Sequence, residues 1–224
     1  MSYIGGMPLT VEIWSDVVCP WCYIGKRRFE TALETFEHSE EVTVMWRSFE
    51  LDQEAPREPE GTATERLAAK YGMSVERAQT LHAEMTERAA AEGLEFHFER
   101  ARGGNTFDAH RMIHLAATYG HQALAQERLM AAYFTEGEAI SDPETLVRLV
   151  AELGVDPEEA RAALALDRFA EDVREDEALA GRLGIQGVPF FVLDRRYGVS
   201  GAQPPETLVA ALERAWGEAV SLNA

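Results

Sequence analysis

The chain has 224 residues, of which 46% are hydrophobic and 27% charged, so we expect a globular fold of one large domain or two small ones. Its formal net charge of -18 argues against binding to nucleic acid or to an anionic membrane surface, since both require basic patches. No apolar run approaches membrane-spanning length, and residues 1–6 lack the basic start and apolar stretch of a signal peptide. We therefore expect a cytoplasmic protein.

The number and spacing of the cysteines limit the kinds of site that the chain can form. The two cysteines of the chain are Cys19 and Cys22, separated by Pro20 and Trp21. A structural disulfide elsewhere and a four-cysteine zinc site are therefore excluded. Because cytoplasmic cysteines stay mostly reduced, a CxxC pair there is more often catalytic or metal-binding than structural.

A strand, a turn and a helix are predicted around the cysteine pair. Residues 10–14 are mostly β-branched or aromatic, which is typical of a strand, and apolar residues recur at helical spacing through residues 21–36. Pro20 would occupy the first position of that helix, where no intrahelical partner is needed for its missing N–H. Cys19 is thus expected at the helix N-terminus and Cys22 about one turn inside.

This placement predicts a nucleophile. Unpaired N–H groups and aligned peptide dipoles at a helix N-terminus favour negative charge, so Cys19 is the expected attacking thiolate. Cys22 is close enough to form a disulfide with it, and the pair could cycle between dithiol and disulfide. The alternative is two ordinary core cysteines. If Asp16 lay near Cys19, its negative charge would oppose formation of the thiolate. Lys26 and Arg27 could offset that charge, but both are expected to face solvent.

Along the rest of the chain, helical patterns separate two β-rich portions. Strands are predicted at 42–49, 188–193 and 197–200, with a loop at 52–61 and a tight turn at 194–196. Helices are predicted over 62–71, 74–93, 105–119, 121–135, 168–183 and 204–219, with further helix starts at 141–144 and 155–159. The order is β-α-β, a helical insertion, then β-β-α.

Two domains follow from this order. The outer pieces can bury their strands only in one common sheet with helices on its faces, which makes the chain an α/β protein. We assign residues 1–55 together with 185–224 to the sheet domain and residues 56–184 to an all-α insertion domain.

Three sequence runs carry a family resemblance. They are Ser15-Asp16-Val17-Val18-Cys19-Pro20-Trp21-Cys22-Tyr23-Ile24-Gly25, the downstream Gly187-Val188-Pro189, and Asn105-Thr106-Phe107-Asp108-Ala109-His110-Arg111. Together they resemble the DsbA-like branch of the thioredoxin superfamily, and in particular its FrnE group, over residues 9–216. The resemblance implies a thioredoxin-like fold and a thiol–disulfide oxidoreductase that needs no prosthetic group. Its partners would be disulfide-containing proteins or small-molecule thiols.

The resemblance also assigns roles to residues. Cys19 matches the attacking cysteine and Cys22 the resolving one. Val188 and Pro189 match a substrate-binding loop that faces the disulfide, whose proline is typically cis and whose backbone can receive an extended substrate as an added strand. Trp21 is expected to be partly exposed and to offer an apolar platform.

Three polar residues are candidates for supporting roles. The family often has an acid near Glu12, where a buried carboxylate with a raised pKa would relay the Cys22 proton; an exposed strand end is the other interpretation. Asn105 and His110 are expected to line the cleft across the domain interface. His110 and His114 are spaced like two metal ligands on a helix, but no third ligand is evident and we predict no metal.

Two alternative functions stay open. A related branch contains the 2-hydroxychromene-2-carboxylate isomerases and kappa-type glutathione transferases, which typically have a serine in place of Cys19 and use glutathione as the reactive thiol. A glutathione-dependent isomerase or transferase acting on a small molecule is therefore one alternative, with glutathione as co-substrate. The second is a non-enzymatic CxxC protein that binds a soft metal ion.

Overall fold

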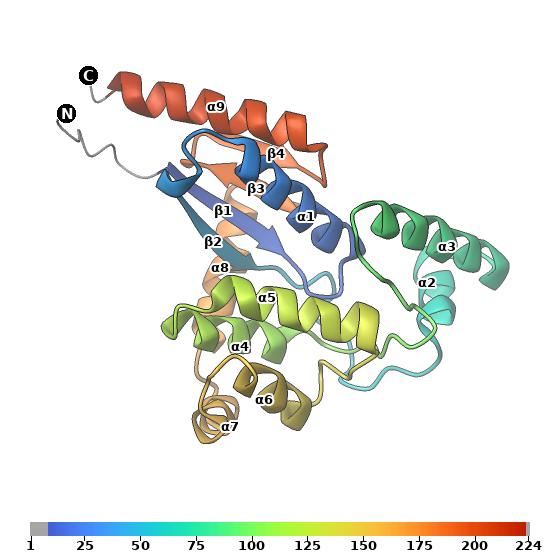
Figure 1. The fold of residues 1–224 in the computed structure, drawn as a ribbon. Helices are drawn as coiled ribbons and strands as arrows, with labels where there is room; N and C mark the ends of the chain where they lie inside the picture. The colour runs from blue at the N-terminus through green and yellow to red at the C-terminus, as the bar shows by residue number, and fades with distance from the viewer. Residues whose placement is uncertain (1–8, 223–224) are drawn as a thin grey trace.

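The computed structural model describes residues 9–222, and the strands within them form one mixed sheet (Figure 1). The strands are β1 (Leu9–Ser15), β2 (Val42–Ser48), β3 (Phe190–Leu193) and β4 (Tyr197–Ser200). Their order in space is β2-β1-β3-β4, with β1 and β2 parallel and the other two pairs antiparallel. The prediction of a mixed sheet shared by the two ends of the chain is confirmed.

Helices cover both faces of this sheet. α1 (Pro20–Thr35) and α9 (Pro205–Leu222) enclose one apolar core, to which β1 contributes Val11 and Ile13. α8 (Ala170–Arg182) lies on the opposite face, where Trp14 of β1 packs against Ala180. Because side chains alternate along a strand, the single strand β1 supplies both cores.

The remaining helical segments follow β1–α1 and precede α8. In chain order they are η1 (Ser39–Glu41), α2 (Ala63–Tyr71), α3 (Val75–Ala91), α4 (Phe107–Thr118), α5 (Gln122–Ala131), η2 (Ala132–Glu136), α6 (Pro143–Ala151) and α7 (Pro157–Ala165). α4 and α5 pack on each other and α5 contacts β2, whereas α2 and α3 form a hairpin that contacts α1 through α3 (Figure 1). The insertion therefore borders the sheet domain at two separate places.

Several helix starts lie where the sequence predicts them. The side chains of Ser74, Asp142 and Asp156 each accept a hydrogen bond from a backbone N–H two or three residues further on, which caps α3, α6 and α7. The helix predicted over 121–135 is different. It is α-helical only to Ala131 and continues as the π-helical turn η2.

The helix predicted over 168–183 begins later, at Ala170, because the preceding chain is held in a turn. Phe169 has a left-handed φ of 63°. The buried Arg111 guanidinium donates one hydrogen bond to the Arg168 carbonyl at 2.9 Å and another to the Ala163 carbonyl at 2.6 Å. The Ala163 carbonyl also accepts from the Arg168 N–H at 3.0 Å, so these bonds hold the turn between α7 and α8 in place.

One helix of the predicted insertion domain, α8, packs on the sheet of the other domain. α8 falls within the insertion assigned to residues 56–184, yet its Asp176 carbonyl accepts a hydrogen bond from the Trp14 indole N–H at 2.9 Å and it covers a face of the sheet. The division itself stays a prediction. Residues 1–6, where we expect no signal peptide, lie outside the described residues. Between residues 9 and 222, no helix has both the length and the apolar character needed to cross a membrane.

Candidate active site

Cys19 is the N-cap residue of α1, with φ -88° and ψ 113°, and Pro20 is the first helical residue. The Cys19 N–H donates to the Asp16 carbonyl at 3.1 Å, and the Cys19 carbonyl accepts from the Cys22 N–H at 3.0 Å. α1 has no side-chain cap and no acidic residue in its first turn. The partial positive charge of this helix end is therefore not neutralised by a neighbouring carboxylate in the helix.

Cys22 lies one turn inside α1 and is more deeply buried than Cys19, with 1% of its surface exposed against 5%. Both cysteines are free thiols. Burial raises the pKa of Cys22 well above its usual value, and the neighbouring Cys19 raises it further, while the Asp16 backbone and the Ser15 hydroxyl act in the opposite direction. Cys22 is therefore held as a neutral thiol at neutral pH.

The loop with Val188 and Pro189 lies directly against the first cysteine. The Val188–Pro189 peptide bond is cis, and the Cys19 Sγ–H donates to the Val188 carbonyl at 3.7 Å. A Cβ atom at Gly25 would lie 2.9 Å from Cγ of Pro189, so only glycine at this position lets the proline ring rest on α1. Within residues 9–222, the Val188 N–H has no hydrogen-bond partner.

Trp21 is the exposed member of the motif. It has 37% of its surface exposed, and the Arg88 guanidinium of α3 lies over its ring at 5.7 Å from the centroid. The α2–α3 hairpin therefore borders the cysteine pair on the side where Trp21 meets solvent.

His110 reaches the turn that holds Cys19. Its Nε2 lies 3.4 Å from Oδ1 of Asp16, both residues are at most 2% exposed, and neither atom has a hydrogen-bond partner within the described chain. The other carboxylate oxygen of Asp16 accepts from the Leu51 N–H at 2.8 Å. Burial disfavours protonated His110, but the carboxylates of Asp16, Glu50 and Glu177 outweigh it and raise its pKa. Sequence reasoning named both residues without pairing them.

Asn105 bonds to the loop that follows β2, and its place in the cleft stays a prediction. Its side-chain amide donates to Oε2 of Glu50 at 3.1 Å and to the Gln53 carbonyl at 3.4 Å, and its Oδ1 accepts from the Phe107 N–H. It therefore ties the start of α4 to the loop after β2. No bond joins it to the cysteine turn within the described residues.

A polar pair that the sequence did not reveal lies beneath the cysteines. Gln126 of α5 donates from Nε2 to the Ser15 hydroxyl at 3.0 Å, and both residues are buried. Because Ser15 accepts this bond, its own proton is free to point at Cys22, whose pKa it lowers. Ser15 belongs to the motif of the cysteines, but nothing in the pattern of α5 marks Gln126.

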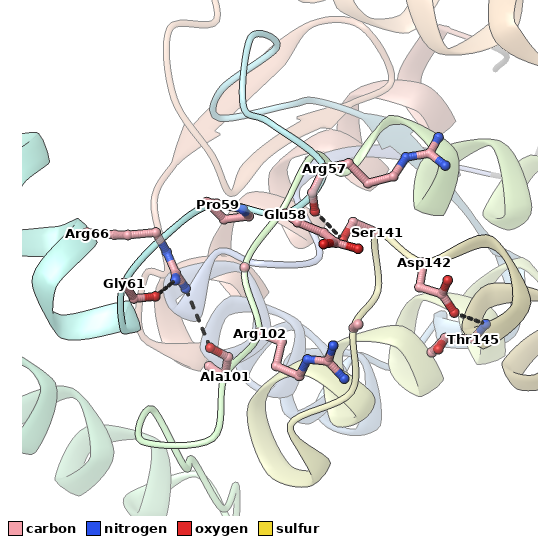
Figure 2. Close-up of a pocket in the computed structure, with 12 residues that line it drawn as sticks. Arg57, Glu58, Pro59, Gly61, Arg66, Ala101, Arg102, Ser141, Asp142 and Thr145 are labelled. Atoms are coloured by element: carbon pink, nitrogen blue, oxygen red, sulfur yellow. Dashed lines mark hydrogen bonds between the residues drawn. The ribbon is translucent and has the colours of Figure 1, made fainter.

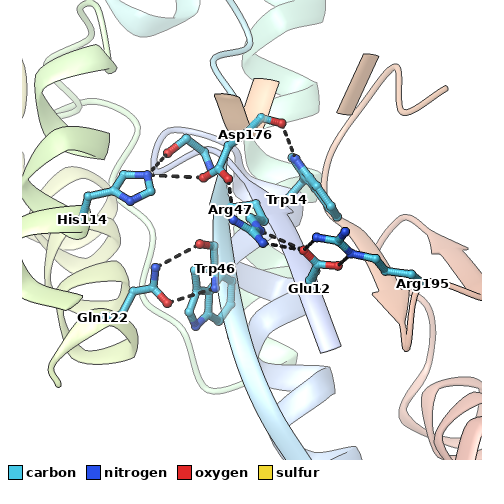
Figure 3. Close-up of polar contacts among 9 residues, drawn as sticks. Glu12, Trp14, Trp46, Arg47, His114, Gln122, Asp176 and Arg195 are labelled. Carbon is cyan, nitrogen blue, oxygen red and sulfur yellow. Dashed lines mark hydrogen bonds and ion pairs between the residues drawn. The ribbon is translucent and has the colours of Figure 1, made fainter. Parts of the chain in front are cut away.

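Both interpretations of Glu12 are wrong. Glu12 is 2% exposed, so it is no exposed strand end. It alternates with Val11 and Ile13, which pack under α1 and α9, and so lies on the face of the sheet that α8 covers. Figure 3 shows its carboxylate directed at Arg47 and Arg195. Burial raises its pKa, but hydrogen bonds from Arg195 and Arg47 outweigh burial and lower it overall, which contradicts a raised-pKa relay.

The expectation for Lys26 is also wrong. Only 4% of its side chain is exposed, and its Nζ contacts Oε2 of Glu127 at 2.6 Å and Oε1 of Glu30 at 2.5 Å. Arg27 pairs with the same two carboxylates. Burial raises the pKa of Glu127, but hydrogen bonds from Arg27, Lys26 and the Tyr23 hydroxyl have the larger effect and lower this pKa to about 2. Glu127 lies on α5, so its position could not be inferred from the pattern of α1.

His110 and His114 are the two residues whose spacing resembles that of metal ligands. Between residues 9 and 222 no group of three or more His, Cys, Asp or Glu side chains is placed to hold a metal ion. His114 instead pairs with Asp176, with 3.3 Å between Nε2 and Oδ2, and lies 3.0 Å from the Ser48 hydroxyl.

Comparison with known proteins gives one family and several similar structures. Residues 10–213 match the family model described as the DSBA-like thioredoxin domain. A crystal structure of a probable DsbA oxidoreductase from Streptomyces coelicolor is 47% identical, with a TM-score of 0.90 and coverage of 94% of this chain and 91% of that one. An uncharacterized Bacillus subtilis protein, YwbO, is 28% identical over 189 residues, covering 84% of this chain and 88% of its own length.

More distant structures share the fold alone. The cytosolic disulfide reductase DsbM from Pseudomonas aeruginosa is 21% identical, with a TM-score of 0.63, and 92% of this chain and 97% of that chain are covered. A 2-hydroxychromene-2-carboxylate isomerase is 17% identical with a TM-score of 0.66, and coverage is 96% and 100%.

Proposed function

Since the chain belongs to the family of DSBA-like thioredoxin domains, we propose that it is a thiol–disulfide oxidoreductase with Cys19 as the nucleophile and Cys22 as the resolving thiol. One observation carries this proposal. Cys19 caps α1 at its N-terminus and contacts the Val188 carbonyl, while Cys22 is buried one turn further in. The FrnE group and a cytoplasmic location are part of the same proposal.

The reaction proceeds in two exchanges. The Cys19 thiolate attacks one sulfur of a substrate disulfide; the substrate S–S bond breaks, a mixed disulfide forms, and the departing sulfur takes up a proton. Cys22 then loses its proton and attacks the Cys19 sulfur, which releases the second substrate thiol. The substrate gains two electrons and two protons, and the protein is left with a Cys19–Cys22 disulfide.

The environment of the two sulfurs supports this division of roles. Burial keeps Cys22 protonated until it is needed, so it does not compete with Cys19 for the substrate. When Cys22 does ionise, the Ser15 hydroxyl and the Asp16 backbone lower the cost of its charge. Cys19 lies at the N-terminus of α1, where unpaired N–H groups and aligned peptide dipoles favour negative charge.

The Val188 backbone would hold an extended substrate. Its N–H is unpaired within residues 9–222, and its carbonyl accepts only a weak thiol donor. A peptide strand could therefore bond to both groups and bring its disulfide to Cys19. Trp21 supplies exposed apolar surface beside the same place.

Glutathione is the proposed recycling thiol or co-substrate. A structure of the Pseudomonas aeruginosa reductase DsbM is described with glutathione, and it covers 92% of this chain at 21% identity. Reduction of the Cys19–Cys22 disulfide needs two electrons, which two glutathione molecules would supply as they form glutathione disulfide. A glutathione-dependent isomerase reaction remains the second candidate, favoured by the likeness in fold to 2-hydroxychromene-2-carboxylate isomerase.

The test is the redox equilibrium of the pair in glutathione buffers, followed by thiol alkylation and mass. A potential near about -270 mV would indicate a reductase and one near about -120 mV an oxidant. Cys22→Ser should accumulate a mixed disulfide on Cys19, and Cys19→Ser should form none. Absence of a Cys19–Cys22 disulfide at every buffer ratio would refute the oxidoreductase proposal and leave the glutathione-dependent reaction to be assayed.

A further inference from the structure

A half-open cavity of about 330 Å³ lies between the segment before α2, the loop before α4 and the start of α6 (Figure 2). Neither cysteine lines it. Its walls include the side chains of Arg66 and Arg102, and also those of Glu58 and Asp142. The redox mechanism uses none of these four residues.

The two arginines are unusual for this chain. Acidic residues outnumber Lys and Arg by 39 to 21, so a cation readily finds a carboxylate. Within residues 9–222, the Lys and Arg side chains that form no ion pair with a carboxylate are Arg66, Lys70, Arg88, Arg102 and Arg182. Two of these cations line the same cavity. The third arginine of the cavity, Arg57, is paired with Asp108 at 2.9 Å.

The Arg66 guanidinium is held in place by neutral groups. Its Nη1 donates to the Gly61 carbonyl at 2.5 Å and its Nη2 lies 3.5 Å from the Ala101 carbonyl. A Cβ atom on Gly103 would lie 2.7 Å from Nη2 of Arg66, so glycine at this position makes room for the group. Within residues 9–222 no carboxylate is paired with this guanidinium, and several of its N–H donors are free to bind a ligand.

The opposite wall of the cavity is also fixed. The buried Ser141 donates its hydroxyl proton to the Arg57 carbonyl at 2.7 Å, which joins the segment before α2 to the start of α6. A ligand would thus meet a cavity that is largely formed in advance, and little ordering would oppose its binding.

The acidic residues of the cavity limit what can bind. Asp142 accepts the Thr145 N–H at 2.8 Å as the cap of α6, and Glu58 has no ion pair between residues 9 and 222. The charges of these two carboxylates offset those of Arg66 and Arg102, so a second negative charge on a ligand would gain little Coulomb energy in the cavity. A guanidinium fork suits the two oxygens of a single carboxylate.

We propose that this cavity is a binding site for a small organic ligand that carries one carboxylate, with Arg66 and Arg102 as its anchors. The site goes beyond the proposed redox function, because it involves neither thiol. Its test is therefore an equilibrium binding measurement that is independent of thiol chemistry.

The experiment follows the side-chain Nε–Hε resonances of Arg66 and Arg102 by NMR in the full-length protein. The probes are succinamate, with one carboxylate, succinamide, with none, and inorganic phosphate. Succinamate should shift both resonances in a saturable way, succinamide should not, and phosphate should bind more weakly. Failure of succinamate to saturate, or tighter binding of phosphate, would overturn the proposal.

Variants then assign the binding to the two arginines. Arg66→Gln and Arg102→Gln should each weaken succinamate binding at least about tenfold, since each removes charge-assisted hydrogen bonds. Arg182→Gln is the matched control, because Arg182 likewise forms no ion pair but lies on α8, away from the cavity. This variant should bind succinamate as tightly as the wild type does. Equal binding by all three variants would refute the assignment.

A further variant tests the geometry without removing a charge. Gly103→Ala should displace the Arg66 guanidinium and weaken binding, with thermal unfolding used to confirm that the protein is folded. If Gly103→Ala does not fold, Arg66→Lys serves instead: it keeps the charge but loses the fork, so its affinity should fall between those of wild type and Arg66→Gln. Wild-type affinity in the variant tested would overturn the role of the fork.

Discussion

The face of the sheet that α1 and α9 cover is apolar, whereas the face that α8 covers carries a buried set of charges, although the same strand β1 supplies both. On the first face, Val11 and Ile13 are at most 1% exposed and pack only among apolar side chains. On the second, Glu12 pairs with Arg47 and Arg195, and Asp176 of α8 pairs with Arg47 as well (Figure 3).

The two faces are stabilised in different ways. An apolar face gains free energy from surface removed from water, roughly in proportion to area and without regard to direction. A buried charge first loses its hydration, and is tolerated only if partners replace the lost bonds. The charged face should therefore be far more sensitive to the loss of one buried partner than the apolar face is to the loss of one methyl group.

The largest effect is expected for Asp176→Ala. Asp176 is 3% exposed and accepts hydrogen bonds from Nη1 of Arg47 at 2.8 Å and from the Ser48 N–H at 2.9 Å. Its removal leaves the buried Ser48 N–H without a partner and takes one of two carboxylates from the Arg47 guanidinium, which keeps only Glu12. The two losses together should lower the free energy of unfolding by about 3–5 kcal/mol. The midpoint of urea denaturation measures this loss. Glu175→Ala, an exposed change on the same helix, should stay within about 0.5 kcal/mol.

A smaller effect is expected on the apolar face for Ile13→Val. Ile13 is 1% exposed, and the lost methyl group leaves a small cavity against α1 and α9. The free energy of unfolding should fall by about 0.5–1.5 kcal/mol, again from urea denaturation. A loss as large as that of Asp176→Ala would contradict the contrast between the two faces.

Arg195→Ala should have a still smaller effect, although it touches the charged face. The Arg195 side chain is 62% exposed, and Glu12 keeps its bonds to Arg47 when Arg195 is removed. We expect a loss of about 0.2–1 kcal/mol, which high salt should reduce. If Arg195→Ala instead matched Asp176→Ala, burial would not be what decides the strength of these pairs.

The last prediction concerns pH. The arginines that face Glu12 outweigh its burial and lower its pKa, so its ionised form is favoured in the folded state. The resulting stability is present above the unfolded pKa of about 4.3 and is lost as pH falls through the lowered folded value. Stability measured from pH 7 downward should therefore decline less steeply in Glu12→Gln than in wild type. Ile13→Val should keep the wild-type slope, and an unchanged slope in Glu12→Gln would contradict the argument.

The sequence predicted the parts of this molecule that local patterns encode. β-branched runs, cap residues and the spacing of Cys19 and Cys22 gave the single sheet, most helix starts and the position of the cysteine pair at the end of α1. These features depend on neighbours within a few residues, so periodicity and turn chemistry are sufficient to find them.

The sequence did not predict the polar partners that come from distant parts of the chain. The sequence predicts that Lys26 faces solvent, because its partner Glu127 is about a hundred positions away on a helix with no distinguishing pattern. The proton relay at Glu12 is an expectation that rests on the family resemblance, with an exposed strand end as the other interpretation. Nothing near Glu12 in sequence shows that Arg47 and Arg195 bond to it. A charged residue in a central strand signals that some partner exists, but not which one.

The cysteine pair and the loop that lies against it are synthesised at different times. Cys19 and Val188 are 169 residues apart in the chain, and a ribosome adding about 5–20 residues per second needs roughly 8–34 s to make that stretch. Through this interval the nascent chain carries both thiols without the loop that will lie against them, and β1 has no β3 to pair with. Newly made chains should therefore be the form most open to unwanted oxidation, and a reducing environment during translation would protect them.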